Sequence, residues 1–330
     1  MAKFLRWTIA WNVCDVRAGV FVAALCERRI LPAVADRRYS ASHTFDGTEP
    51  VPPNYLGSGG HRPPLQKNVR IVTPRYQQIL GIKFFNGHVD EAIAFMSRQG
   101  GFLVAPSGTC FSRLRDDTVY RKSMMNADVA IPDSGAMVLL WRILRGRKIA
   151  RISGLKYLQR LLATLKGEGT SKIFWILPGE RSRQKLLDWS WRQSFAIKIE
   201  DCYAAPQYGM EIEDRHLLAL IEKSRPNHVI IAIGSGPQEK LGYYLRENLS
   251  YRPVIHCTGA ALGFVTGDQA AIPDWADRFY LGWFLRLLAQ PRRFIPRLWN
   301  AHELPWLIWK YGENLPLLCK EKVERLKSEV

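Results

Sequence analysis

Short apolar runs recur along the chain, and the polar stretches between them are long enough to hold helices. We expect strands over residues 79–85, 102–105, 127–131, 172–177, 197–200, 228–233 and 254–257. Between them, Ala92, Ile93 and Met96 share one face of a helix predicted over residues 90–98, and further helices are expected from about residues 136 and 181. Strands that alternate with helices predict the α/β class. We expect a Rossmann-like parallel sheet with helices on both faces.

The strand predicted over residues 127–131 is followed by a tight turn and then by an apolar helix. Pro132 ends the strand, because proline cannot donate to a sheet ladder, and Ser134-Gly135 allow the turn. This junction places Asp133 at the carboxyl edge of the sheet, where open α/β sheets bind their ligands. Asp133 is therefore a candidate catalytic residue. The alternative is that Asp133 only caps the helix that follows, a position that aspartate favours.

The strand predicted over residues 228–233 runs into a glycine-rich loop, residues 234–240. Glycines allow backbone N–H groups to approach an anion, and the start of a helix adds its dipole. Pro237 suits the first turn of that helix. The loop lacks the spacing of a Walker loop and the third glycine of a dinucleotide fingerprint. It predicts a phosphate or diphosphate site, and the alternative is a glycine-rich turn that binds nothing.

The composition narrows the class of function. The 330 residues carry a formal net charge of +17, which indicates an anionic partner: phosphate-bearing substrates, an acidic membrane or nucleic acid. Six scattered cysteines without a C-x-x-C pair are typical of reduced thiols in a cytosolic protein. The chain has no Asp-x-Asp pair and no histidine cluster with ligand spacing, so we expect no metal and no cofactor.

The two ends differ in composition from the middle. Residues 1–75 are basic, loop-rich and weakly periodic, which predicts a flexible extension, and residues 76–272 form the expected α/β domain. We assign residues 273–330 to a helical, membrane-associating appendage. No stretch reaches the 18 or so consecutive apolar residues of a transmembrane helix.

The segment from Arg278 to Arg297 is basic and aromatic, and carries five arginines with no acidic residue between its ends. That pattern is typical of an amphipathic helix lying on anionic lipid. The alternative is a helix packed on the core with a solvated basic face. Nucleic acid is the third candidate, but no nucleic-acid-binding motif accompanies the charge.

Four stretches, taken together and in this order, resemble the WecG/TagA/CpsF glycosyltransferase family. They are residues 126–133, 233–240, 258–267 and 283–293, and the resemblance covers about residues 79–298. It implies an inverting, metal-independent transfer of a sugar, N-acetylmannosamine, its uronate or a related hexose, from a UDP-sugar donor. The implied acceptor is a sugar linked to polyprenyl diphosphate, used in making cell-surface polysaccharides. The implied location is cytoplasmic, on the inner face of the membrane.

The resemblance also implies roles for individual residues. It makes Asp133 the general base, a role that fits a carboxylate within reach of a weakly nucleophilic sugar hydroxyl. Ser107 or Thr109 would stand in for the threonine of the family's T-P-N loop, which reads Ala105-Pro106-Ser107 here. The other substrate-binding positions that it implies are Asn126, Arg151, Gly234, Gly236, Gln238, Arg286, Arg292, Arg293 and Arg297.

Several positions depart from the family pattern. Lys156 replaces a usual acid, Ser134 replaces a glycine, and Leu262-Gly263 and Gly282 replace other typical residues. These departures leave open a second class of function, a non-catalytic homologue that binds a nucleotide or a membrane. The expected partners are a UDP-sugar, a lipid-linked acceptor and an anionic membrane surface, but not nucleic acid. A homo-oligomer is compatible with the sequence.

Overall fold

The computed structural model describes residues 75–169, 171–268 and 301–319, which contain one eight-stranded sheet in the order β1-β2-β4-β3-β8-β7-β5-β6. β1 and β2 pair antiparallel, whereas every other neighbouring pair is parallel. The strands are β1 (Tyr76–Ile79), β2 (Ile82–Phe85), β3 (Gly101–Val104), β4 (Val129–Ala130), β5 (Ile173–Leu177), β6 (Cys202–Ala204), β7 (His228–Ile231) and β8 (Val254–Cys257). The predicted α/β class and its mostly parallel sheet are confirmed.

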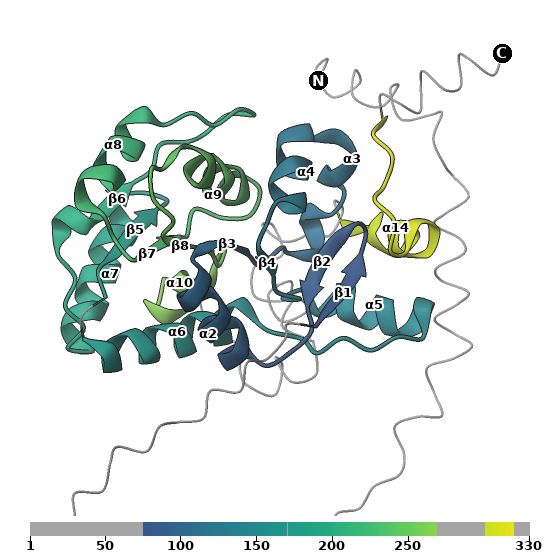
Figure 1. Ribbon diagram of the computed structural model, residues 1–330, viewed down its shortest axis with the longest axis horizontal. Helices are drawn as coiled ribbons and strands as arrows, with labels where there is room; N and C mark the ends of the chain where they lie inside the picture. Colours follow the sequence, from purple (N-terminus) through teal and green to yellow (C-terminus); the bar gives the residue numbers. More distant parts are fainter. Residues whose placement is uncertain (1–74, 170, 269–300, 320–330) are drawn as a thin grey trace, which may run out of the picture. The chain divides into compact units, whose positions relative to one another are not determined.

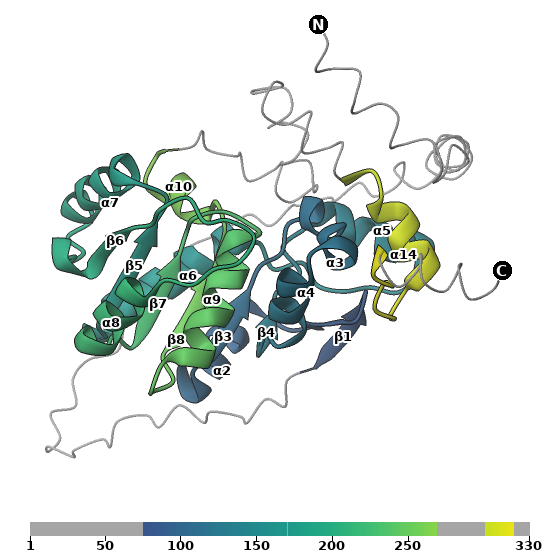
Figure 2. The same cartoon turned by 90° about the horizontal axis from the view of Figure 1, so that it is seen from above.

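Helices cover both faces of the sheet, as predicted (Figures 1 and 2). Side chains of α2 (Val89–Gln99), α6 (Gly154–Glu168), α7 (Glu180–Arg192) and α10 (Ala261–Val265) join the buried cluster on one face. The cluster on the other face takes side chains from α4 (Thr118–Met125), α5 (Gly135–Arg145), α8 (Arg215–Ser224), α9 (Pro237–Asn248) and α14 (Leu304–Tyr311). Three short elements complete the described chain: α3 (Arg113–Asp116) and the 3₁₀ turns η1 (Gly108–Cys110) and η2 (Ile199–Asp201).

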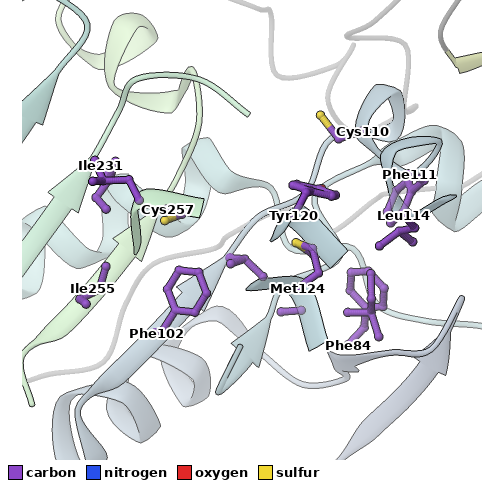
Figure 3. Close-up of a cluster of buried hydrophobic side chains, with 14 of the residues drawn as sticks. Phe84, Phe102, Cys110, Phe111, Leu114, Tyr120, Met124, Ile231, Ile255 and Cys257 are labelled. Carbon is purple, nitrogen blue, oxygen red and sulfur yellow. The ribbon is translucent and has the colours of Figure 1, made fainter. Parts of the chain in front are cut away.

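The central strands β3, β4, β5, β7 and β8 are buried at every residue, because both of their faces are covered. In β3, Phe102 and Val104 point into one cluster and Leu103 into the other. Figure 3 shows the first of these clusters, where Phe102, Ile255 and Cys257 of the central strands meet Tyr120 and Met124 of α4. The contiguous apolar runs in the sequence are therefore the signature of the central strands.

Two predicted strands differ from the structure. The run over residues 79–85 is a hairpin of two strands, because Leu80 and Gly81 turn the chain with φ values of 50° and 81°. Leu80 is nevertheless fully buried, which hides the turn from a hydrophobicity pattern. The strand expected over residues 197–200 was also wrong. This region enters η2 with Ile199 59% exposed, and the edge strand β6 begins only at Cys202.

The end of the described chain packs against its beginning. α14 lies beside α5 (Figures 1 and 2), and the backbone that follows α14 reaches the β1–β2 turn. There the N–H of Leu80 donates to Gly312 O and the N–H of Gly81 to Glu313 O, both at 2.8 Å. The predicted 1–75 extension, apart from residue 75, and the basic segment 278–297 lie outside the described residues. Among the described helices, none combines the length and the apolar character needed to cross a bilayer.

A buried polar chain crosses the core between α6 and two central strands. The hydroxyl of Tyr157 lies 3.0 Å from Nδ1 of His256, and Nε2 of His256 lies 3.1 Å from Nδ1 of His228. His256 is 1% and His228 5% exposed, and their rings stack. Burial and the neighbouring His228 hold the pKa of His256 well below its usual range. The histidines are therefore part of the packed interior.

Candidate functional site at the carboxyl edge of the sheet

Four loops meet at the carboxyl ends of neighbouring parallel strands. In the order of the sheet they follow β4, β3, β8 and β7. β4, which follows β3 in the chain, lies on one side of β3, whereas the later strands β8, β7 and β5 lie on its other side. Ligands of open α/β sheets bind at such a reversal of strand order, so this edge is the candidate site.

Asp133 lies in the loop after β4, and its carboxylate meets the start of α6. Asp133 Oδ1 accepts the backbone N–H of Gly154, the first residue of that helix, at 2.8 Å. Ser134 caps α5 instead, since its hydroxyl accepts the N–H of Met137. The capping alternative considered for Asp133 therefore does not hold for α5. A helix N-terminus favours a carboxylate, and Asp133 remains partly exposed at the edge.

Arg151 also belongs to this part of the site. Its Nε donates to the backbone carbonyl of Asp133 at 2.8 Å, which ties the approach to α6 to the loop after β4. Gly154 itself allows the loops to approach one another. A side chain there would lie 3.4 Å from Thr258 O, 3.6 Å from Ala105 Cβ and 3.7 Å from Asp133 Cγ. The loops after β3, β4 and β8 are thus in close contact around Asp133.

Gln238 connects the loops after β7 and β8 from a fully buried position. Its Oε1 accepts the N–H of Gly259 at 2.9 Å, and its Nε2 donates to Glu239 Oε1 at 3.0 Å. Glu239 is equally buried, and its Oε2 accepts the N–H of Gly236 at 2.5 Å. Burial raises the pKa of Glu239. The glycine-rich loop is therefore held by its own helix, and the N–H of Gly236 already has a hydrogen-bond partner.

Two hydroxyls lie in the loop after β3. Ser107 Oγ and Thr109 Oγ1 are 3.0 Å apart, and Ser107 donates to Cys110 Sγ at 3.4 Å. Burial raises the pKa of the Cys110 thiol, and the nearby carboxylate of Glu239 raises it further. Ser107 and Thr109 thus bring two hydroxyls to the carboxyl edge of the sheet, and Gly108 between them lies against Ser134 in the loop after β4.

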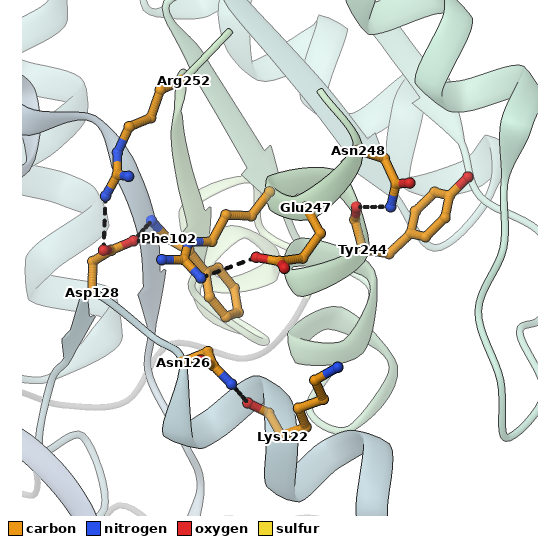
Figure 4. A network of polar contacts seen from close by, with 9 residues as sticks. Phe102, Lys122, Asn126, Asp128, Tyr244, Glu247, Asn248 and Arg252 are labelled. Atoms are coloured by element: carbon orange, nitrogen blue, oxygen red, sulfur yellow. Dashed lines mark hydrogen bonds and ion pairs between the residues drawn. The ribbon is translucent and has the colours of Figure 1, made fainter. Parts of the chain in front are cut away.

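The structure brings most of the predicted site residues to one edge but separates Asn126 from them. The residues brought together are Ser107, Thr109, Asp133, Arg151, Gly234, Gly236 and Gln238. Asn126 ends α4 before β4 begins, so it lies at the amino edge, where its Nδ2 donates to Lys122 O (Figure 4). Arg286, Arg292, Arg293 and Arg297 lie outside the described residues.

Sequence reasoning missed three residues at this edge. Glu239 had a readable signal, because an acid three residues after a helix start often folds back to bond the cap. Thr258, whose buried hydroxyl has no hydrogen-bond partner among the described residues, and Arg113, which lies against Gly236, carry no local signal. In the described part of the chain, no three His, Cys, Asp or Glu side chains gather as metal ligands would.

Comparison with known proteins identifies the family of this chain. The sequence model of the glycosyl transferase WecG/TagA/CpsF family matches residues 77–317. An N-acetylglucosaminyldiphosphoundecaprenol N-acetyl-beta-D-mannosaminyltransferase of Bacillus subtilis (strain 168) is 25% identical over 179 residues, which are 54% of this chain and 67% of the relative. The protein of the same name from Bacillus spizizenii (strain ATCC 23059 / NRRL B-14472 / W23) is 21% identical over 196 residues, 59% of this chain and 74% of the relative.

The family match spans most of the chain and includes every loop of the candidate site. The two relatives are named as sugar transferases, as the resemblance of the ordered motifs implies. With its α/β sheet and the carboxylate at its carboxyl edge, the chain belongs to the WecG/TagA/CpsF family of glycosyltransferases.

Proposed function

We propose that the protein transfers N-acetylmannosamine, its uronate or a related hexose from a UDP-sugar to a sugar linked to polyprenyl diphosphate. The two relatives are named for an N-acetylmannosaminyl group and for an N-acetylglucosaminyldiphosphoundecaprenol acceptor. We further propose that the transfer inverts the anomeric centre, needs no metal and serves the synthesis of a cell-surface polysaccharide.

One observation carries the proposal: the partly exposed carboxylate of Asp133 at the carboxyl edge, anchored by the N–H of Gly154. A carboxylate fixed in this way can accept a proton at a set position without first having to be ordered. The surrounding loops supply the hydroxyls of Ser107 and Thr109 and the cation of Arg151. This donor set suits a phosphorylated sugar donor more than an apolar ligand.

In the proposed reaction, the acceptor hydroxyl oxygen forms a bond to the anomeric carbon of the donor sugar. Asp133 accepts the hydroxyl proton as the bond forms. The bond between the anomeric carbon and the β-phosphate oxygen breaks, and its electron pair leaves with UDP. Attack on the face opposite UDP inverts the centre. Fixed cations and helix N-termini stabilise the charge that develops on UDP.

We place the protein at the inner face of the membrane, because the proposed acceptor is anchored there by its lipid. The high positive charge of the chain supports attraction to an anionic surface. Restricting enzyme and acceptor to one surface also raises their effective concentration. In this proposal the arginines between residues 278 and 297 carry part of that attraction, and Arg286 or Arg292 reaches the diphosphate.

The experiment is a panel of UDP-sugars, each incubated with a short-chain polyprenyl-diphosphate-linked N-acetylglucosamine. We expect acceptor-dependent UDP release with a donor of the N-acetylmannosamine class, and a product whose new bond is inverted. A protein that binds UDP but releases none with any donor would instead be the non-catalytic homologue.

A second arm tests metal independence on the same assay. Because positive side chains and helix ends are proposed to stabilise the leaving group, turnover should be unchanged in excess EDTA. Loss of turnover that Mg²⁺ or Mn²⁺ restores would overturn that part of the proposal.

A further inference from the structure

Arg113 lies directly over the glycine-rich loop, although more than a hundred residues separate the two in the chain. Gly236 has φ 102°, and a side chain at this position would lie 1.9 Å from Nη1 of Arg113. Glycine at position 236 is therefore needed twice, once for the backbone conformation and once for the space that the guanidinium fills. A long exposed side chain at the start of α3 is thus held at a defined place on the candidate site.

A buried carboxylate contacts the same glycine as this guanidinium. Glu239 is 0% exposed, and the positive charge of Arg113 acts on it and lowers its pKa against the larger effect of burial. Glu239 also accepts the N–H of Gly236, so this N–H is not available to an incoming phosphate. The start of α9 therefore lacks a donor that a phosphate site at a helix N-terminus would use. A cation on the same loop can replace it.

The neighbouring cation cannot take this role. Lys240 is 4% exposed, and its Nζ is already bound to Asp117 Oδ2 at 2.9 Å and to Met210 O at 2.6 Å. Arg113 differs because it is exposed to solvent at the edge of the sheet. Its planar guanidinium also matches two phosphate oxygens at once, which an ammonium group does not.

A buried hydroxyl in the same cluster is unsatisfied. Tyr120 is 0% exposed, and its hydroxyl has no hydrogen-bond partner among the described residues. Burial raises the pKa of this phenol, the charge of Glu239 raises it further, and the charge of Arg113 lowers it. Figure 3 shows Tyr120 and Cys110 in this part of the molecule. A buried polar group without a partner is costly, so its place next to the candidate site is consistent with a functional role.

We propose that Arg113 binds the diphosphate of the nucleotide donor, and that Glu239 positions the Arg113 guanidinium over the glycine-rich loop. Ser107 and Thr109 lie beside Cys110 in the loop after β3, at the same edge of the sheet. The ligand class is a nucleoside diphosphate. The inference rests on the proposed function and deepens it by naming a residue that holds the leaving group.

Calorimetric titration of the full chain with UDP, UMP and uridine tests the role of Arg113. Arg113→Ala should weaken UDP binding about tenfold or more, as expected for a lost bond to a charged group. Uridine has no phosphate, so its affinity should not change, and Arg113→Lys should give an intermediate affinity for UDP. Arg98→Ala is the matched control, because it removes one exposed arginine from the last turn of α2, at the opposite edge.

A double-mutant cycle tests the positioning role of Glu239. Glu239→Gln removes the charge that acts on Arg113 and should weaken UDP binding in the wild-type background. In the Arg113→Ala background the same change should have no further effect on UDP binding. A purely structural role for Glu239 would instead weaken UDP binding in both backgrounds. Thermal melts establish that each variant is folded before its affinity is compared.

The possible outcomes distinguish a failure of this inference from a failure of the proposed glycosyltransferase function. If Arg113→Ala binds UDP as tightly as the wild type, the role of Arg113 is overturned and the glycosyltransferase proposal still stands. Additive effects in the cycle would overturn the positioning role of Glu239. Wild-type protein that binds no nucleoside diphosphate would overturn the proposed donor and this inference with it.

Discussion

Asp133 and Asp128 lie beyond opposite ends of β4, a strand of only two residues, and their surroundings differ. Asp128 accepts the N–H of Phe102 at 2.8 Å and forms ion pairs with Arg252 and Arg246 at the amino edge (Figure 4). Its carboxylate is saturated by structural bonds. Asp133 accepts a backbone N–H at the carboxyl edge, among the loops of the candidate site. The two aspartates therefore form a matched pair for mutation.

Asp133→Asn should lower turnover about 100-fold or more, because an amide cannot accept the hydroxyl proton. The amide oxygen can still accept the N–H of Gly154, so we expect the melting temperature to stay close to that of the wild type. Initial rates of UDP release and thermal melts measure the two effects. Asp128→Asn should show the reverse, a lower melting temperature with turnover retained in the folded fraction. Near-normal turnover of folded Asp133→Asn would end the assignment of a general base.

How far single residues could be predicted depends on whether their role is local. Asp133 was identifiable because a strand, a proline and a turn fix its place at the carboxyl edge. Asn126 was assigned by resemblance alone, and the chain places it before the strand, at the other edge. Arg113 meets Gly236 only through tertiary packing, so its neighbours in sequence say nothing of its role.

At the scale of elements, the central strands were the easiest to predict. The run at residues 254–257 coincides with β8, since both faces of this strand are covered and every residue is buried. The outer elements were harder. β6 has only three residues and is half-buried beyond its first position, and the β1–β2 turn is concealed by buried Leu80. Edge elements carry weaker apolar patterns because only part of their surface meets the core.

The packing of α14 on α5 gives a prediction at this scale. Leu307 is 0% exposed within the cluster that α14 shares with α5, whereas Trp309, two residues later, is 63% exposed. Leu307→Ala should lower the free energy of unfolding by about 2–5 kcal/mol, because it leaves a cavity in the core. Trp309→Ala is the control and should change it far less. Urea unfolding of both variants measures the difference, and equal effects would contradict the packing of α14 described above.

At the scale of the whole molecule, the buried histidines give stability a dependence on pH. His256 is held neutral in the fold, while in the unfolded chain it titrates near its usual pKa of about 6.5. Below that value the unfolded state binds a proton that the native state does not. Stability should therefore fall as the pH falls, with a slope that approaches 1.4 kcal/mol per pH unit for this one group.

Urea unfolding between pH 7.5 and 5.5 measures this slope, and His256→Gln provides the comparison. Glu239 acts in the opposite direction, because its raised pKa gives stability at low pH that is lost as the pH rises. Glu239 is present in both proteins, so its effect cancels in the difference between them. We expect a shallower loss of stability on acidification in His256→Gln. Identical slopes would show that His256 does not carry the effect.

The contact between the β1–β2 turn and the backbone after α14 has a consequence for the order in which the protein is made. Synthesis runs from the amino end, so Leu80 and Gly81 leave the ribosome long before Gly312 and Glu313 exist. Gln77 and Glu313, which also bond to each other, are 236 positions apart. During translation the central strands can pair first, while the N–H groups of Leu80 and Gly81 are hydrogen-bonded to water. The border of the sheet formed by β1 and β2 is thus completed by residues that are translated much later than the hairpin itself.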